Sequence, residues 1–198
     1  LSRRLVIAND TTLAAATDLG GFGIDIASGR TLTLGAGQAS GRSVTGAGSV
    51  QLTGVDDRTL DFSQVSVSGT RSGTLASGAS LVRLDAGTVM SAVTLSVGAG
   101  QTLALSAAQA TRVATDGGRV VGAGTTRISD LGTVAANLSS IQTTRVEATL
   151  SASVSTLAAG TVLGTSIVSI PAGRSLALSA AQLNGARLEG AGTLVLTG

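Results

Sequence analysis

The chain contains no cysteine, histidine, lysine, tryptophan or tyrosine, and Pro171 is its single proline. The lack of cysteine excludes disulfides and thiolate metal sites, so packing and backbone hydrogen bonds must stabilise the fold. Phe22 and Phe62 are the only aromatic residues, whereas β-sandwich domains usually rely on aromatic core residues. The core is therefore expected to be thin and built from Leu, Val, Ile and Ala.

Charge is also scarce, with 13 arginines against 11 acidic residues and a net charge of +2. The sequence pI of about 10.9 arises because no group titrates between the carboxylates and arginine. It does not indicate a basic patch, so we expect no nucleic-acid partner. No apolar run approaches the roughly 18 residues that span a bilayer, and residues 1–10 lack the features of a signal peptide. We therefore expect no membrane insertion, and any secretion signal to lie outside this sequence.

The residues that are abundant favour short strands. The chain has 28 glycines and is 43% hydrophobic, and its frequent Thr, Ser and Val suit strands separated by tight turns. Helix is the poorer expectation. Alternating polar and apolar residues predict further strands. These segments are 49–52, 63–67, 80–84, 92–97, 148–154 and 193–196.

An internal repeat organises the chain. The segment GRTLTLGAGQ at 29–38 returns as GQTLALSAAQ at 100–109 and as GRSLALSAAQ at 173–182, which indicates a period of about 72 residues. A Gly-Ala-Gly triplet follows each copy, at 46–48, 122–124 and 190–192. In each copy the two leucines alternate with polar or small residues, so we expect both to face one side of a strand.

A parallel β-solenoid (β-helix) accounts for this pattern. Its narrow interior accepts Leu, Val and Ala, its outward positions accept Thr, Ser and Arg, and glycine forms the corners. Turns of roughly 18 to 24 residues would place three or four in each period. The rival interpretation is a string of small β-sandwiches, one for each period. We expect a single solenoid domain over 1–198, as a window of a longer repetitive chain.

Two acidic segments are candidate sites. GGFGIDIAS at 20–28 begins like a calcium-binding nonapeptide, but it occurs once, so a glycine-rich turn with an exposed Asp25 is the favoured interpretation. Asp56, Asp57 and Asp61 suggest the paired carboxylates of polysaccharide hydrolases and lyases. Adjacent strand residues point to opposite faces, so only one of Asp56 and Asp57 could join Asp61. Solvated turn charges are the favoured interpretation, and no catalytic, cofactor-binding or metal-binding residue is predicted.

A glutamine recurs with the repeat, four residues after a leucine of inward parity. Its three positions are Gln38, Gln109 and Gln182. A strand that continued to them would point their amides inward, where each amide needs hydrogen-bond partners. We expect each glutamine to satisfy backbone groups at a corner of the coil.

Other local motifs support no site. The glycine-rich segment at 35–41 lacks the lysine and the strand–loop–helix setting of a phosphate loop. The glycosylation triplets at Asn9 and Asn137 are expected by chance in a Ser- and Thr-rich chain. An ice-binding face would need threonine in one regular column, and we expect no such column to continue from Thr31 and Thr33 through each turn.

The segment LSAAQLNGARLEGAGTLVLTG at 178–198 resembles the β-strand repeats of giant bacterial surface and extracellular proteins, a class that includes adhesins, filament components and surface-layer components. The resemblance covers most of the chain but lies in style and composition. It implies an extracellular protein at the bacterial cell surface and transfers no active-site residue.

The function expected from the sequence is therefore structural and not enzymatic, with no cofactor. In the first interpretation the chain forms a filament, surface layer or matrix by head-to-tail stacking on itself, with cell-surface polysaccharide as a possible further partner. The alternative is the stalk of an adhesin or fibre whose binding tip lies elsewhere. The third interpretation is a polysaccharide-active β-helix enzyme.

Overall fold

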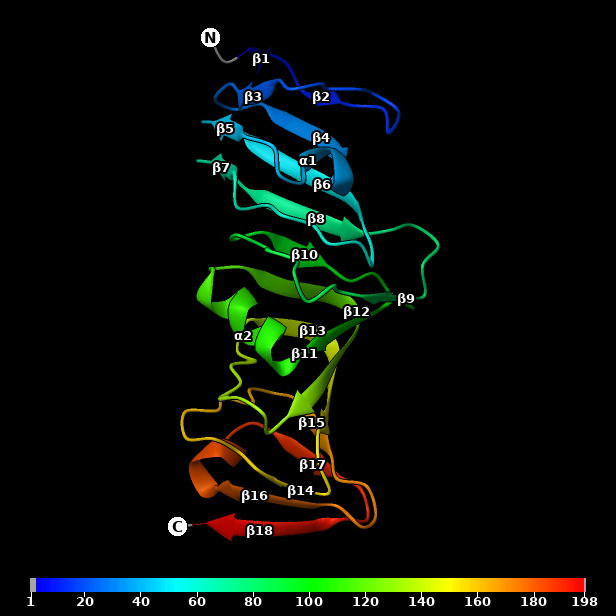
Figure 1. Cartoon of the computed structure of the whole chain (residues 1–198), viewed down its shortest axis with the longest axis vertical. Coiled ribbons are helices and arrows are strands. Elements are labelled where there is room, and N and C mark those ends of the chain that lie inside the picture. The colour runs from blue at the N-terminus through cyan, green and yellow to red at the C-terminus, as the bar shows by residue number, and fades with distance from the viewer. Residues whose placement is uncertain (1–2, 198) are drawn as a thin grey trace. The chain divides into compact units, whose positions relative to one another are not determined.

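The computed structural model describes residues 3–197 and is built from short parallel strands that stack as a β-solenoid (Figure 1). The chain divides into two compact units, Leu1–Ser96 and Val97–Gly198. Counted over both units, the coil has about ten turns. The predicted fold class, an all-β parallel solenoid, is confirmed.

The first unit contains two ladders of parallel strands. One ladder has the order β1 (Arg4–Ile7), β3 (Gly23–Ile26), β5 (Val44–Gly46) and β7 (Val65–Val67). The other has the order β2 (Thr11–Thr12), β4 (Thr31–Gly35), β6 (Ser49–Val55), β8 (Arg71–Leu75) and β10 (Thr94–Ser96). One helical turn, α1 (Ala36–Ala39), follows β4, and the short strand β9 (Leu81–Arg83) precedes β10. Each of the first four turns thus contributes one strand to each ladder.

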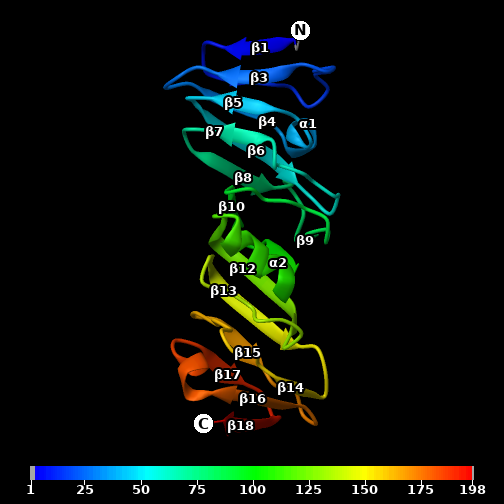
Figure 2. The same ribbon diagram turned by 60° about the vertical axis from the view of Figure 1, so that its left-hand side comes forward.

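The second unit also contains two ladders of parallel strands, and two of its strands are longer than any in the first unit (Figure 2). One ladder contains β11 (Thr102–Ser106), β12 (Arg119–Leu131), β13 (Ile141–Leu150), β15 (Ile167–Ser169) and β17 (Arg187–Glu189). The other contains β14 (Val154–Thr156), β16 (Ser175–Ser179) and β18 (Thr193–Thr197). Two helical segments interrupt the strands, α2 (Ala107–Thr115) and the 3₁₀ turn η1 (Ala180–Leu183). No helix among residues 3–197 is long and apolar enough to cross a membrane.

Columns of aliphatic side chains fill the interior. In the register of β4 and β6, Leu32 lies opposite Val50 and Leu34 lies opposite Leu52, and all four side chains are buried. Because successive strand residues point to opposite faces, the polar residues between them face outward. Phe62 is fully buried and is the largest core side chain. The core is therefore thin and aliphatic, as the composition predicts.

The Gly-Ala-Gly triplets lie where the chain passes very close to the preceding strand, at the ends of β5 and β17 and at a register shift inside β12. At Gly46 the φ angle is +115°, and a Cβ atom there would lie 2.2 Å from the carbonyl oxygen of Ile26. Gly122 and Gly190 have φ angles of +121° and +118°. A Cβ atom at these two residues would lie 2.3 and 2.2 Å from the oxygens of Val97 and Ile170. Only glycine fits these three positions, because it has no Cβ and adopts positive φ without strain.

Most predicted strands are present. The three repeat copies form β4, β11 and β16, and each is followed by a helical turn. The predicted strand at 148–154 is wrong, because the chain bends at 151–153, between β13 and β14. The nine-residue helix α2 was not expected. The elements between successive copies also differ, so the period of about 72 residues stays a prediction.

Candidate functional site

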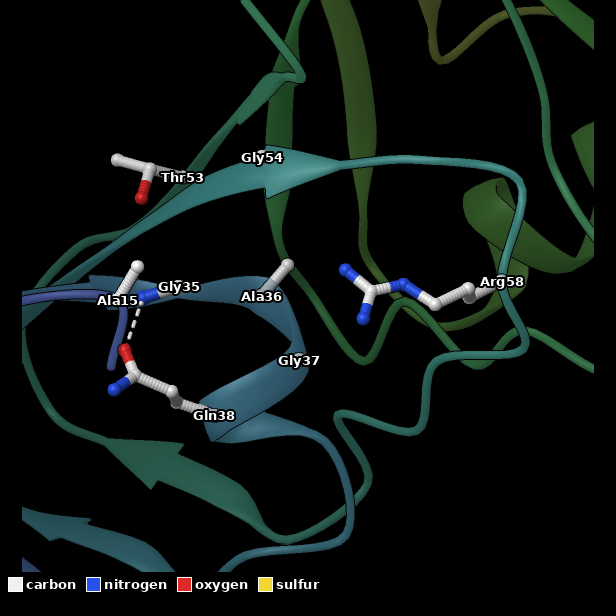
Figure 3. Close-up of a pocket in the computed structure, with 8 residues that line it drawn as sticks. All are labelled: Ala15, Gly35, Ala36, Gly37, Gln38, Thr53, Gly54 and Arg58. Atoms are coloured by element: carbon white, nitrogen blue, oxygen red, sulfur yellow. Dashed lines mark hydrogen bonds between the residues drawn. The ribbon is translucent and has the colours of Figure 1, made fainter. Parts of the chain in front are cut away.

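A hollow of the first unit lies where β4 ends and α1 begins (Figure 3). It has a volume of about 410 Å³. Its lining residues are Ala15, Gly35, Ala36, Gly37, Gln38, Thr53, Gly54 and Arg58. The polar side chains among these are one amide, one hydroxyl and one guanidinium, so the hollow offers hydrogen bonds and one positive charge.

The amide of Gln38 is engaged with the backbone. Its Oε1 atom accepts a hydrogen bond from the Gly35 N–H at 2.8 Å, and its Nε2 atom donates to the carbonyl oxygens of Ala14 and Thr17, both at 3.0 Å. Gln38 lies in α1, because the strand ends before it. It therefore bridges two turns of the coil at a corner, as the sequence predicts.

The equivalent glutamines of the second unit also bind backbone groups. Gln109 accepts a hydrogen bond from the Ser106 N–H at 2.7 Å. Gln182 accepts one from the Ser179 N–H and donates to the carbonyl oxygen of Ala158, both at 2.8 Å. In all three copies the amide satisfies backbone groups, which accounts for the recurrence of glutamine.

Arg58 brings the positive charge to the hollow but is paired with Asp56. Its Nη2 atom lies 2.8 Å from Asp56 Oδ2, and its Nε atom donates to both carboxylate oxygens. The hydrogen bond from the Arg58 side chain lowers the pKa of Asp56 below its ordinary value. Both side chains are partly or largely exposed to solvent, so the pair contributes little to stability.

The other two candidate carboxylates have separate backbone partners. Asp57 Oδ1 accepts the Arg83 N–H at 2.7 Å, and Asp61 Oδ1 accepts the Ser63 N–H at 2.8 Å. Hydrogen bonds from the Ser63 hydroxyl and N–H lower the pKa of Asp61. Asp61 thus orders its own turn, whereas Asp57 links its turn to a segment 26 residues further along the chain.

The expected setting of Asp25 is wrong. The residue lies in strand β3 and not in the glycine-rich turn, which ends before Gly23. Its side chain is 32% exposed, and its Oδ1 atom lies 3.0 Å from Arg4 Nη2 on the neighbouring strand β1. Asp25 therefore forms a cross-strand ion pair. Across residues 3–197, no group of three or more acidic side chains is placed to hold a metal ion.

The two glycosylation triplets lie at different depths. Asn9 is exposed, and its carbonyl oxygen accepts a hydrogen bond from the Thr11 hydroxyl at 2.8 Å. Asn137 is half-buried, and its Oδ1 atom accepts hydrogen bonds from the Ser139 N–H and hydroxyl. The side-chain oxygen of Asn137 thus orders its own turn.

Three arginines that the sequence analysis did not single out tie corners together. Arg42 donates from Nη1 to the carbonyl oxygens of Gly20 and Phe22, at 3.0 and 2.6 Å. Arg71 and Arg174 likewise each donate to two backbone carbonyl oxygens, at 3.0 to 3.2 Å. A guanidinium can serve several carbonyls at once because its donors form a rigid planar fork.

In the second unit, Glu147 is the centre of a small ion-pair network. It pairs with Arg127 on β12 and with Arg145 on its own strand, β13. Burial raises the pKa of Glu147, but hydrogen bonds from Arg145 and Arg127 outweigh burial and hold the pKa below its ordinary value. The network lies on the outward face, where alternating charges stabilise neighbouring strands.

In the first unit, uncharged polar residues occupy the outward face of the ladder from β2 to β10. In the register from β2 to β10 the column is Thr12, Thr33, Gln51, Ser72 and Thr94. The Thr33 hydroxyl donates to Gln51 Oε1 at 3.3 Å. Because Gln51 and Ser72 interrupt the threonines, there is no continuous threonine column, as the sequence analysis expects.

The last turn of the second unit exposes apolar residues of inward parity. Leu194 and Leu196 on β18 lie opposite Leu176 and Leu178 on β16. The side chains on β16 are buried, at 0% and 1% exposed, whereas Leu194 is 40% and Leu196 is 61% exposed. Val195, which faces outward, is 46% exposed. This set, Leu194, Val195 and Leu196, is called the β18 apolar edge below.

Comparison with known proteins adds no relative. No protein-family model, no curated protein and no solved structure matches the chain. The interpretation of function therefore depends on the described geometry and on the sequence.

Proposed function

We propose that the chain is a non-catalytic structural element of a bacterial extracellular or cell-surface protein, and that its solenoid is extended head-to-tail by another copy. A filament, surface layer or matrix is the assembly that such stacking builds. The class of protein comes from the resemblance of the repeat to large surface proteins. The stacking rests on the β18 apolar edge.

The β18 apolar edge carries this proposal because it continues the core. Leu194 and Leu196 occupy the same columns as Leu176 and Leu178, yet no further strand among residues 3–197 pairs with the far side of β18. Full burial of a leucine side chain stabilises by about 1.5–3 kcal/mol, and the unpaired strand edge offers backbone donors and acceptors to another strand. A further turn of the coil, with a strand parallel to β18, would cover both the leucine side chains and the strand edge.

Head-to-tail stacking also has a geometric consequence. Contacts between the two different ends of a solenoid are heterologous, so they generate open filaments if rotation does not close them into a ring. The first turn of the first unit has a second open edge, because β1 is the outermost strand of its ladder among residues 3–197.

Light scattering after size-exclusion chromatography, with negative-stain electron microscopy, tests the proposal on the 198-residue chain. We expect the mean mass to rise with protein concentration and filaments to appear. Leu196→Asp should reduce the assembled fraction at least tenfold while the far-UV circular dichroism spectrum stays unchanged. Val154→Asp is the matched control, because Val154 is 70% exposed but belongs to β14. A monomer at every concentration would refute stacking and favour the stalk of an adhesin.

A further inference from the structure

We propose that the corner at 90–93 in the first unit is an oxidation-sensitive switch. In its closed form the guanidinium of Arg71 holds the corner over the buried side chain of Met90. In its open form Met90 reaches solvent, and oxidation of its sulfur keeps the corner open. The switch is independent of stacking between copies, because every group that forms it lies within the first unit.

The backbone of this corner is strained. Ser91 and Ala92 have φ angles of +39° and +60°, in the left-handed region that residues with a Cβ rarely adopt. The Val93 N–H donates to the Met90 carbonyl oxygen at 3.0 Å, so two left-handed residues are enclosed by one hydrogen bond, as in a type I′ turn. Such turns usually contain glycine or asparagine. Strain of this kind persists only where the surrounding contacts hold it.

The second unit uses glycine at the matching position. The segment LDAGTVMS at 84–91 recurs as LAAGTVLG at 157–164. In this alignment Ser91 corresponds to Gly164, which has a φ angle of +59°. Glycine adopts such an angle without strain. The first unit therefore holds with contacts a backbone conformation that the second unit adopts freely.

Arg71 supplies a contact that holds the strained corner. It lies at the start of β8, and its Nη1 atom donates to the Ser91 carbonyl oxygen at 3.2 Å. Its Nη2 atom donates to the Val67 carbonyl oxygen, also at 3.2 Å. Because both nitrogens belong to one rigid planar group, the guanidinium ties the corner to the preceding turn of the coil.

The segments on both sides of the corner are anchored. Before the corner, the Val89 N–H donates to the Leu60 carbonyl oxygen at 2.8 Å. After the corner, Thr94 lies opposite Ser72 in the register of β10 and β8. The corner can therefore open while the neighbouring segments stay paired, which is the kind of local opening that occurs without global unfolding.

Met90 gives the open corner a chemical consequence. Its side chain is 2% exposed, and it is the single methionine of the chain. In the open form, hydrogen peroxide can transfer one oxygen atom to the thioether sulfur. The O–O bond breaks, an S–O bond forms, and the sulfur loses two electrons as the peroxide is reduced to water. The sulfoxide is polar and is costly to return to an apolar interior, so the oxidised corner stays open.

Oxidation by hydrogen peroxide, followed by intact-mass spectrometry, tests the role of Arg71. Because the chain has no cysteine, histidine, tryptophan or tyrosine, the gain of one oxygen atom reports on Met90. Arg71→Gln should be oxidised about tenfold faster than the unaltered chain, because the corner loses a charged donor. Ser91→Gly/Ala92→Gly should be oxidised about threefold more slowly, because glycine removes the strain of the closed form.

The matched control is Arg42→Gln, because Arg42 also donates to backbone carbonyl oxygens at a corner of the first unit. We expect this variant to be oxidised at the rate of the unaltered chain, since its corner does not cover Met90. Equal acceleration in the two arginine variants would overturn the role of Arg71. A glycine variant that is oxidised as fast as the unaltered chain would overturn the role of strain.

Hydrogen exchange tests whether oxidation keeps the corner open. After peroxide treatment, the amides of 91–96 should exchange about tenfold faster than in the untreated protein. Met90→Leu keeps the volume of the core side chain and lacks the sulfur, so peroxide should leave its exchange unchanged. Unchanged exchange after complete oxidation of Met90, or equal acceleration in Met90→Leu, would overturn the switch.

Discussion

Gly46 lies so close to Ile26 that a Cβ atom at residue 46 would stand 2.2 Å from the Ile26 carbonyl oxygen. The nearby N–H of Gly48 donates to that same oxygen at 3.0 Å. A side chain at Gly46 would therefore push the corner away from the strand and break this hydrogen bond. The same arrangement at Gly190 joins the last two turns of the second unit.

Gly46→Ala and Gly190→Ala should therefore each lower the free energy of unfolding by about 3 kcal/mol or more, since overpacking adds to the strain of positive φ. Urea denaturation followed by far-UV circular dichroism measures the change. Gly29→Ala is the control for backbone strain, because Gly29 has φ +70° and nothing lies within 4 Å of its Cβ position. An equal loss in all three variants would contradict the steric argument.

Gln38→Leu should lower the free energy of unfolding by about 1–3 kcal/mol, because it leaves backbone groups of two turns without their partner. The carbonyl oxygens of Ala14 and Thr17 and the N–H of Gly35 lose the amide. Gln51→Leu is the control, since Gln51 is exposed on the outward face. Equal stability of the two variants in urea would show that the corner amide is dispensable.

Arg42→Lys should destabilise by about 1–2 kcal/mol although the charge is kept, because an ammonium cannot reproduce the fork that serves three carbonyl oxygens. Those oxygens belong to Gly20, Phe22 and Gln38. Arg30→Lys, at an exposed position, should have no measurable effect on the thermal midpoint. Equal thermal midpoints for the two variants would contradict a stabilising role of the Arg42 guanidinium.

The pH dependence follows from depressed carboxyl pKa values. Asp56, Asp61, Asp85 and Glu147 all titrate below their ordinary values in the folded chain. A carboxyl group whose pKa is lowered in the folded state contributes its full stabilisation at pH values above its unfolded pKa. This contribution is lost as the pH falls through the folded pKa. We therefore expect the free energy of unfolding to be nearly constant from about pH 6 to 9 and to fall below about pH 4.

Urea titrations across this range measure the effect, and Glu147→Gln isolates its main network. The variant should lose about 1 kcal/mol at pH 7, as expected for two partly exposed ion pairs, and should fall less steeply below pH 4. A steep change in the free energy of unfolding between pH 6 and 9 in the unaltered protein would contradict the assignment of its pH dependence to these carboxyl groups.

The strands could be predicted where alternation and glycine coincide, as at Leu32 and Leu34. Corners without glycine could not be predicted. The apolar–polar alternation continues through 148–154 although the chain bends there, because serine fits both a strand and a bend. The length of the helical segment that follows each repeat copy could likewise not be predicted from the repeat. Gly41 and Gly185 follow the glutamine closely in two copies and end the helical turn, whereas helix-forming residues continue it to Thr115 in α2.

The candidate site was predictable only in part. The role of the glutamines follows from their recurrence, since a buried amide needs partners. The ion pair of Asp25 with Arg4 depends on the register of two strands far apart in sequence, which alternation alone does not determine. The arginine forks depend on corner geometry in the same way.

The ladder hydrogen bonds of each unit run from one turn to the next, and this direction determines how the chain responds to mechanical force. Asp10 contacts Thr31 on the next turn, 21 residues further along the chain. Tension applied through the chain ends therefore loads the bonds of one turn at a time, so each unit should unravel by peeling from its edge strands. Because each repeat contacts mainly its neighbours, release of one turn leaves the others folded. Each released turn would lengthen the chain by roughly 70 Å.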